Sequence, residues 1–168
     1  MCENSTDNGG IIGVFPQFTF DGYCGDIINY YARAFDMQPA YLVCYKDSLH
    51  ANEVTGPGGD KIYCAIFSFP HGDRCYALKI KDSLDAALYN RNTYRTDIPT
   101  QSHSGGNPVL ALRHHDKAFL TAAFNKLSEG VCAKLNKTLT TDSDGSLHGS
   151  LIDSYGTCWE FNEMEERS

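Results

Sequence analysis

The segment that most constrains the fold is residues 61–80, KIYCAIFSF–PHGD–RCYALKI. Two runs of aromatic and aliphatic residues flank a four-residue turn, and this pattern predicts a β-hairpin. A symmetric turn places Phe69 opposite Arg74. Because alternate side chains on a strand share a face, the hairpin has a predicted core face made of Tyr63, Ala65, Phe67, Phe69, Tyr76, Leu78 and Ile80. The opposite face carries Cys64 and Cys75.

Seven cysteines are spread along the chain: Cys2, Cys24, Cys44, Cys64, Cys75, Cys132 and Cys158. None forms the C-x-x-C pair of a structural zinc site. Widely spread cysteines in a small chain indicate disulfides between distant elements, and an odd number leaves one thiol unpaired or bonded between chains. The hairpin register separates Cys64 from Cys75 by about four residues, or ~13 Å. Disulfides need Cα atoms within ~7 Å, so we predict that these two cysteines do not bond each other.

Composition points to one secreted domain over residues 1–168, with frayed ends at 1–10 and 162–168. The sequons at Asn4 and Asn136 are compatible with glycosylation on a secretory route. The net charge is −7, and the 14 basic residues are scattered among 21 acidic ones. Polyanion binding requires clustered Lys and Arg, so no nucleic-acid partner is expected. No apolar run approaches the ~20 residues of a membrane-spanning helix, and no membrane partner is expected either.

Periodicity predicts the remaining elements. Residues 24–37 have the 3.6-residue period of a helix, with Ile27, Ile28, Tyr31, Ala34 and Phe35 on one face. The longest predicted helix is 116–135, whose apolar stripe is Leu120, Ala123, Phe124, Leu127, Val131 and Leu135. The other expected elements are strands at 11–15, 40–46 and 108–113, a short helix at 82–91, a long loop at 92–108, and one or two closing strands within 150–161.

These elements predict an α+β fold: a mostly antiparallel sheet with two main helices packed on it, an α/β sandwich stabilised by disulfides. A doubly wound parallel sheet is disfavoured, because too few strands are separated by crossover helices.

The cluster His114-His115-Asp116 precedes the longest predicted helix. Adjacent side chains on a strand or helix diverge, so the two histidines are expected to point apart rather than to share a metal ion. Asp116 suits an N-cap, which accepts hydrogen bonds from the first free backbone N–H groups of a helix. Metal binding and acid–base chemistry are the alternatives for this cluster.

Other chemistry has little support in the sequence. There is no G-x-S-x-G elbow, and the glycine-rich stretch at 55–61 lacks phosphate-loop spacing. A ribonuclease-like hydrolase would draw on His71, Arg74, His103, Arg113, His114 and His148. The strand KIYCAIFSF of the predicted core hairpin carries no Glu or Asp to serve as the base. No catalytic residue, cofactor or metal is therefore assigned.

As a whole, the chain resembles the small cysteine-rich secreted effectors of plant-pathogenic fungi, of the avirulence type. The resemblance rests on a Cys-bearing first helix in FDGYCGDIINYYARAF, on cysteines within the strands YLVCYK, IYCAIF and RCYALKI, and on a late cysteine in YGTCWEF. It implies a disulfide-held α/β sandwich that acts in virulence or is recognised by host immunity.

The leading functional hypothesis is therefore a secreted, non-enzymatic effector that binds a host protein. The alternatives are a small secreted ribonuclease-like hydrolase and a small-ligand carrier, since Tyr-rich sheet faces can line pockets. If binding uses a loop, the 92–108 segment is the strongest candidate. The partner, the disulfide connectivity and the oligomeric state stay open.

Overall fold

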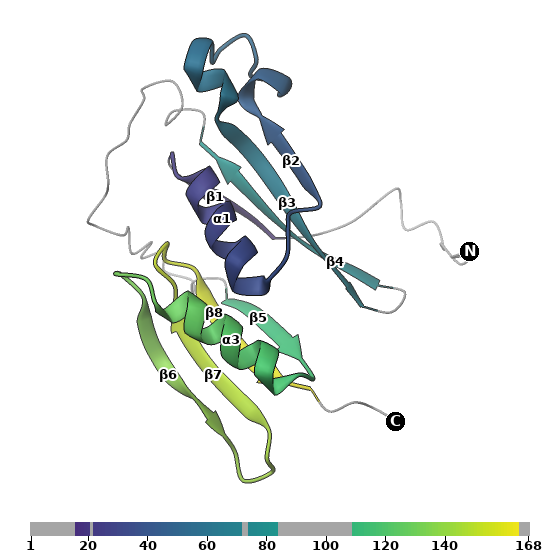
Figure 1. The fold of residues 1–168 in the computed structure, drawn as a ribbon, viewed down its shortest axis with the longest axis vertical. Helices are drawn as coiled ribbons and strands as arrows, with labels where there is room; N and C mark the ends of the chain where they lie inside the picture. Colours follow the sequence, from purple (N-terminus) through teal and green to yellow (C-terminus); the bar gives the residue numbers. More distant parts are fainter. Residues whose placement is uncertain (1–15, 21, 72–73, 84–108, 165–168) are drawn as a thin grey trace. The chain divides into compact units, whose positions relative to one another are not determined.

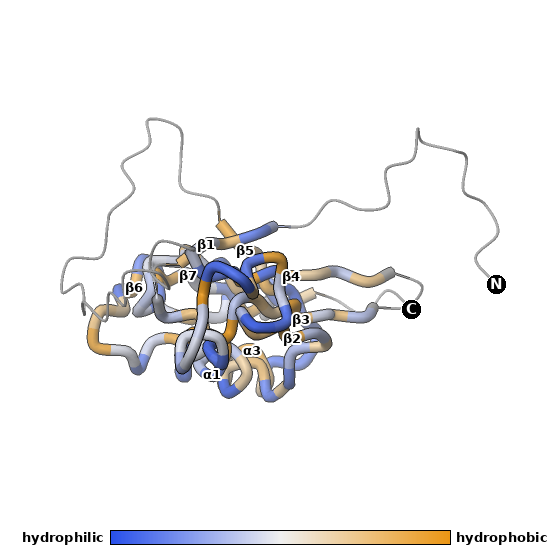
Figure 2. The backbone as a smooth tube through the Cα atoms, turned by 90° about the horizontal axis from the view of Figure 1, so that it is seen from above, coloured by the Kyte–Doolittle hydropathy of each residue, from blue (hydrophilic) through white to orange (hydrophobic). Residues whose placement is uncertain are grey.

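The computed structural model describes residues 16–20, 22–71, 74–83 and 109–164. The chain divides into two compact units. Within the described residues, unit 1 comprises 16–25 and 38–83, and unit 2 comprises 26–37 and 109–164. Hydrophobic and hydrophilic stretches are intermixed along the described backbone (Figure 2). No described helix is long and apolar enough to cross a membrane.

Unit 1 is built on sheet A, whose strand order is β1-β4-β3-β2 (Figure 1). Its strands are β1 (Gln17–Phe20), β2 (Tyr41–Cys44), β3 (Ile62–His71) and β4 (Arg74–Asp82). Strands β2, β3 and β4 pair antiparallel, whereas β1 pairs parallel with β4. Two short 3-10 helices, η1 (Tyr45–Asp47) and η2 (Gly56–Asp60), lie between β2 and β3.

The predicted hairpin exists, but its register differs from the expected one. His71 pairs with Arg74, so the connection has two residues instead of four and Phe69 lies opposite Tyr76. Both strands continue further than the sequence pattern indicated. Because the register shifts by two residues, every side chain keeps its face.

The predicted core face is therefore confirmed at the centre of the hairpin, although Tyr63, at a register irregularity with β2, is only half-buried. Ala65, Phe67, Leu78 and Ile80 are all buried in unit 1. Tyr76 is an exception, at 54% exposed, because it lies near the tip of the hairpin. At the other end of β4, the buried Asp82 carboxylate accepts a hydrogen bond from the backbone N–H of Gly22 at 2.7 Å.

Unit 2 is built on sheet B, whose strand order β5-β8-β7-β6 repeats that of sheet A. Its strands are β5 (Val109–His114), β6 (Lys134–Thr141), β7 (Leu147–Ile152) and β8 (Cys158–Glu163). Helix α3 (Lys117–Ser128) lies across this sheet (Figure 1). Strand β5 pairs parallel with β8, and the remaining pairs are antiparallel.

Helix α1 (Cys24–Phe35) starts in unit 1, but from Asp26 onward it belongs to unit 2. The face predicted for it is buried, including Ile27, Ile28 and Tyr31. The Tyr31 ring packs edge-on against Trp159, with ring centroids 5.5 Å apart. This aromatic contact explains why the helix groups with sheet B.

Helix α3 ends earlier than predicted. It stops at Ser128, and Val131 is fully exposed while Leu135 lies on β6. The reason is Gly130, where a Cβ atom would overlap the Ser154 side chain. The chain must pass close to Ser154 at this point, and it turns there into β6. The first four residues of the predicted stripe are correct: Leu120, Ala123, Phe124 and Leu127 are buried.

The predicted fold class is wrong in two respects. First, there are two four-stranded sheets, each made by a β-α-β-β-β segment with one parallel pair. In each segment the helix is a crossover that lets the strands before and after it run in the same direction. Second, the six described cysteines are free thiols, so no disulfide staples the described part of the fold.

Several predicted elements fall outside the description. The strand at 11–15, most of the helix at 82–91 and the loop at 92–108 lie in residues that the structure does not describe, as do Cys2 and Asn4. Strand β1 begins directly after Pro16, where the sequence predicted no strand. Asn136 lies on β6 and is exposed, and its glycosylation stays a prediction.

Candidate functional site

Sheet B has one face covered by α3 and one face opposite it, which we call the far face. On the covered side, Phe124 of α3 packs edge-on against Phe161 of β8 at 5.1 Å. Gly149 of β7 lies beneath the same ring, and a Cβ atom there would come within 3.1 Å of it and within 2.9 Å of the Leu139 backbone. Since alternate residues change face, His148 and Ser150 belong to the far face.

Strand pairing places the far-face residues in three rows across the sheet. The first row is Arg113, Asn162, His148 and Thr140. The second row is Ala111, Glu160, Ser150 and Lys137. The third row is Val109, Cys158, Ile152 and Lys134. Neighbouring strands lie about 4.8 Å apart, so neighbouring members of a row are within reach of one small molecule.

His148 is held in place by a carboxylate. Its Nδ1 atom lies 2.8 Å from Oδ2 of Asp142, and the imidazole is 14% exposed. A carboxylate only accepts hydrogen bonds, so Nδ1 carries the hydrogen and Nε2 is the nitrogen left to act. Nε2 lies 3.5 Å from the Thr140 hydroxyl, at the limit of a hydrogen bond. An oriented imidazole of this kind can accept a proton from a bound molecule.

The two residues beside His148 in the first row have open polar groups. Arg113 is exposed, and Asn162 pairs with both Arg113 and His148 across the sheet. Neither side chain has a hydrogen bond or ion pair within the described part of the chain. The guanidinium and amide are therefore available donors for an oxygen-bearing ligand.

The far face changes character from the first row to the third. The second row contains one carboxylate, Glu160, which is exposed. The third row is mainly apolar, and Val109 is 49% exposed. The sheet thus offers a cationic end, a central carboxylate and an apolar end.

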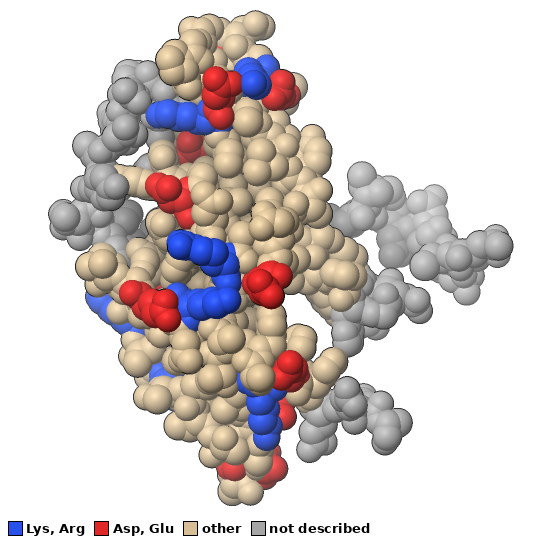
Figure 3. Space-filling view, in the orientation of Figure 1, with Lys and Arg blue, Asp and Glu red and all other residues tan. Residues whose placement is uncertain are grey.

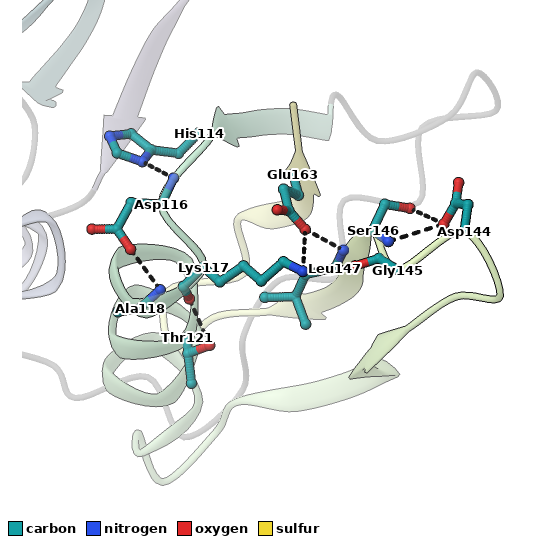
Figure 4. Close-up of polar contacts among 10 residues, drawn as sticks. All are labelled: His114, Asp116, Lys117, Ala118, Thr121, Asp144, Gly145, Ser146, Leu147 and Glu163. Carbon is teal, nitrogen blue, oxygen red and sulfur yellow. Dashed lines mark hydrogen bonds and ion pairs between the residues drawn. The ribbon is translucent and has the colours of Figure 1, made fainter. Parts of the chain in front are cut away.

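The His114-His115-Asp116 cluster serves the start of α3 (Figure 4). Asp116 is the N-cap, and its Oδ1 accepts from the backbone N–H groups of Ala118 at 2.8 Å and Phe119 at 3.3 Å. This confirms the N-cap interpretation. The histidines do not point apart, however: their ring centroids are 4.9 Å from each other, because Asp116 N–H donates to Nδ1 of His114 at 2.9 Å and turns that ring toward the corner.

A second group of contacts closes this end of unit 2 (Figure 4). The Lys117 ammonium donates to the Gly145 carbonyl at 2.7 Å and lies 3.4 Å from Glu163. The same Glu163 carboxylate accepts from the Leu147 backbone N–H at 2.8 Å. These bonds connect α3, β8 and the β6–β7 turn. The Lys117 and Glu163 side chains therefore have a structural role in holding these elements together.

Asp153 is a completely buried carboxylate in the turn between β7 and β8. It accepts from the Tyr31 hydroxyl at 2.7 Å, from Nε1 of Trp159 at 2.9 Å, and from the backbone N–H groups of Tyr155 and Thr157. Burial raises its pKa, and the Tyr31 hydrogen bond opposes that rise. Because it has no exposed surface, Asp153 serves packing rather than ligand binding.

The described thiols show no sign of activation. Burial raises the pKa of Cys24 and of Cys64, which favours the unreactive thiol form. Across the described ranges, no three His, Cys, Asp or Glu side chains are grouped so as to hold a metal ion.

The fold does not bring together most of the residues that a ribonuclease-like hydrolase would draw on. Arg113 and His148 share the far face with one strand between them, but His114 lies on the α3 side of the sheet. His71 and Arg74 pair through their backbones at the hairpin end, and His103 lies outside the described residues.

The sequence analysis did not identify Asp142, which orients His148, or Asn162, which lies beside it, as candidate site residues. The alternation in HGSLI and CWEFNE was the available signal, because it places His148 and Asn162 on one face once the two strands are paired.

Charged groups on the surface are mixed in sign. On the face shown in Figure 3, Lys and Arg side chains lie among Asp and Glu side chains, with wide neutral areas around them. No continuous basic surface is visible on that face among the residues described.

Comparison with known proteins gives similarity in fold. No protein-family model matches the sequence, and no curated protein matches it. Among solved structures, protein PA1353 from Pseudomonas aeruginosa matches with a TM-score of 0.62 and 19% identity, over 93% of this chain and 100% of that one. The PhnB protein from Bacillus cereus matches with a TM-score of 0.55 and 18% identity, over 90% and 98% of the two chains. A glyoxalase/bleomycin resistance protein from Catenulispora acidiphila has a TM-score of 0.49 and 16% identity, over 92% and 100%.

These findings correct the functional hypothesis. The interpretation as a disulfide-held fungal avirulence-type effector is wrong, because the chain shares its fold with PA1353 and the PhnB protein over nearly their whole length and the described cysteines form no disulfides. A disulfide-stabilised virulence protein is accordingly set aside, together with its ribonuclease-like alternative, and secretion stays a prediction. The error arose because cysteine spread was interpreted as a disulfide framework, whereas Cys24 and Cys64 are ordinary buried thiols.

Proposed function

We propose that the protein binds a small amphipathic carboxylic acid on the far face of sheet B. The observation that carries the proposal is the alignment of Arg113, Asn162 and His148 in one row, with His148 oriented by Asp142. The Arg113 guanidinium can bind a carboxylate through two parallel N–H···O hydrogen bonds. The Asn162 amide can donate to the same group.

The other two rows define the rest of the ligand. Glu160 lies one row away, where its carboxylate can accept from an amino or hydroxyl group next to the ligand's carboxylate. Val109, Cys158 and Ile152 offer an apolar surface for the remaining carbon chain. Together these groups favour an amino or hydroxy acid with an apolar side chain.

Two probes test this proposal: hexanoate and 2-aminohexanoate, which differ only by an ammonium group. Calorimetric titration should detect both with the wild-type protein. Arg113→Gln should weaken both at least about tenfold, since a charge-assisted hydrogen bond contributes roughly 1.5–3 kcal/mol. Arg33→Gln, which removes the same charge from the exposed surface of α1, is the matched control and should change neither affinity.

Glu160→Gln separates the two probes. It should weaken 2-aminohexanoate and leave hexanoate unchanged or slightly tighter. The proposal fails if neither probe binds, or if Arg113→Gln binds both as well as the wild type does.

A second candidate activity is proton transfer by His148. It is favoured by one observation, the 2.8 Å contact with Asp142 that orients the imidazole and leaves Nε2, 3.5 Å from the Thr140 hydroxyl, as the acceptor nitrogen. In D₂O, the wild-type protein should speed the exchange of the C3 hydrogens of 2-oxohexanoate, measured by ¹H NMR. His148→Gln should abolish the acceleration, whereas His115→Gln should retain it. Equal exchange with and without His148 would restrict the protein to binding.

A further inference from the structure

Sheet A carries a pair of lysines on one strand and one face. Lys79 and Lys81 are two residues apart on β4, so both point away from the buried Ile80. We call this side the lysine face of sheet A. Both lysines are only half-exposed.

The neighbours of these lysines are neutral. Across β1, Lys79 pairs with Gln17 and Lys81 pairs with Thr19. Across β3, their partners are Ile66 and Cys64. None of these partners is a carboxylate, and neither ammonium group has an ion pair within the described ranges. Lys81 has one recorded contact, with its Nζ 5.3 Å from the centre of the Tyr63 ring.

Lys79 and Lys81 are half-buried, whereas Lys134, Lys137 and Arg113, which are unpaired within the described residues, are exposed. The chain has 21 acidic residues against 14 basic ones, so carboxylates are plentiful. Two other lysines form ion pairs with carboxylates: Lys46 Nζ lies 2.8 Å from Asp60, and Lys117 Nζ lies 3.4 Å from Glu163. Two adjacent, half-buried cations without a carboxylate repel each other and lose hydration, and a bound anion relieves both costs.

Both ammonium groups act on the Cys64 thiol, which lies on the neighbouring strand β3. Burial raises the pKa of the Cys64 thiol, while Lys79 and Lys81 both pull that pKa downward. A side chain that is 6% exposed thus experiences both positive charges. The exposed Gln17 amide and Thr19 hydroxyl add neutral donors on the same face.

We propose that the lysine face of sheet A is a binding site for a doubly charged oxyanion of the phosphoryl type, held between Lys79 and Lys81. Lysine binds phosphate as a point charge and needs no fixed fork geometry. The polar groups of Gln17 and Thr19 can donate to the remaining oxygens. Its residues belong to sheet A in unit 1, whereas the proposed carboxylate site is built from residues of sheet B in unit 2.

The test is a titration of the full chain with inorganic phosphate at constant ionic strength, with potassium chloride as the compensating salt. The wild-type protein should bind phosphate and melt at a higher temperature in its presence. The double variant Lys79→Gln/Lys81→Gln should bind at least tenfold more weakly. Lys79→Arg/Lys81→Arg keeps the charges and should keep binding, and Lys46→Gln is a control at a lysine already paired with Asp60.

Two further arms identify the form of the ligand. Phenyl phosphate and inorganic sulfate are titrated in the same way. Preference for phenyl phosphate indicates a phosphate ester, and equal binding of all three indicates a free oxyanion; both support the site. If the double variant does not fold, each single Lys→Gln variant should still weaken phosphate severalfold.

The proposal is overturned if phosphate adds nothing beyond the effect of potassium chloride, or if the double Gln variant binds it as tightly as the wild type. Arg113→Gln should leave phosphate affinity unchanged. Failure of the sheet B proposal is therefore distinguishable from failure here.

Discussion

Sheet A and sheet B have the same strand order and the same single parallel pair, yet the lysine face of sheet A and the far face of sheet B carry different chemistry. Sheet A presents two lysines among neutral partners. Sheet B presents an arginine, a carboxylate and a histidine that is paired with an acid. Topology therefore determines which residues share a face, and the residue types at those positions determine which ligand each face suits.

The described part of each unit also buries one carboxylate. Asp82 in unit 1 accepts from the Gly22 backbone and lies 3.4 Å from the Tyr45 hydroxyl. Asp153 in unit 2 accepts from two side chains and two backbone groups. In both units a tyrosine hydroxyl reaches the carboxylate, which connects a sheet to a segment distant in sequence.

The largest expected effect tests whether α3 covers one face of sheet B. Leu127 is fully buried, so Leu127→Ala should reduce the free energy of unfolding by about 2–5 kcal/mol. Denaturant unfolding measures this change. Val131→Ala is the control, because Val131 belongs to the sequence-predicted stripe but is fully exposed, and it should change stability by less than about 0.5 kcal/mol. Equal losses at both positions would mean that the helix continues past Ser128.

A similar loss is expected at the buried carboxylate of unit 2. Asp153→Ala leaves the Tyr31 hydroxyl and Trp159 Nε1 without their acceptor, which should cost on the order of 3 kcal/mol. Thermal or denaturant unfolding provides the measurement. Glu129→Ala, at an exposed residue, should have almost no effect. If the Asp153→Ala variant were as stable as the wild type, the structural role of these hydrogen bonds would be contradicted.

A smaller effect is expected at the start of α3. Asp116→Ala removes the N-cap acceptor and should cost about 1 kcal/mol. Asp116→Asn keeps an acceptor and should recover most of that loss. If Asp116→Ala retained full stability but lost affinity for hexanoate, the cluster would be a ligand site instead of a helix start.

The smallest effect is a dependence on pH. Because burial raises the pKa of Asp153, the folded protein takes up this proton before the unfolded chain does. Wild-type stability relative to Asp153→Asn should thus increase as the pH falls from the raised pKa toward about 3.9, by at most about 1.4 kcal/mol per pH unit. Asp144 is the contrasting control: its pKa is lowered by the Ser146 hydrogen bonds, so wild type should lose stability relative to Asp144→Asn in acid. If acid changed the relative stability in the same direction for Asp153→Asn and for Asp144→Asn, the opposite pKa shifts of the two carboxyl groups would be contradicted.

Local patterns in the sequence were sufficient for much of each unit. Alternation identified the core face of the 61–80 hairpin, and the 3.6-residue period identified the buried face of α1. These patterns depend only on neighbours in the chain. The N-cap at Asp116 was recoverable for the same reason.

Long-range features were not recoverable in this way. The parallel pairs β1–β4 and β5–β8 join segments far apart in sequence, and nothing local in Gln17–Phe20 signals its partner. The end of α3 depends on Ser154, which meets Gly130 only after folding. The contact of His148 with Asp142 became visible only when the β6–β7 pairing was known.

The contrast between the two sheet faces can be measured directly by backbone amide NMR on the full chain, titrated separately with inorganic phosphate and with 2-aminohexanoate. The account predicts that phosphate shifts the signals of β4 around Lys79 and Lys81, and that 2-aminohexanoate shifts those of β5, β7 and β8 around Arg113, His148 and Glu160. Shifts confined to α1 and α3, or the same residues responding to both probes, would contradict it.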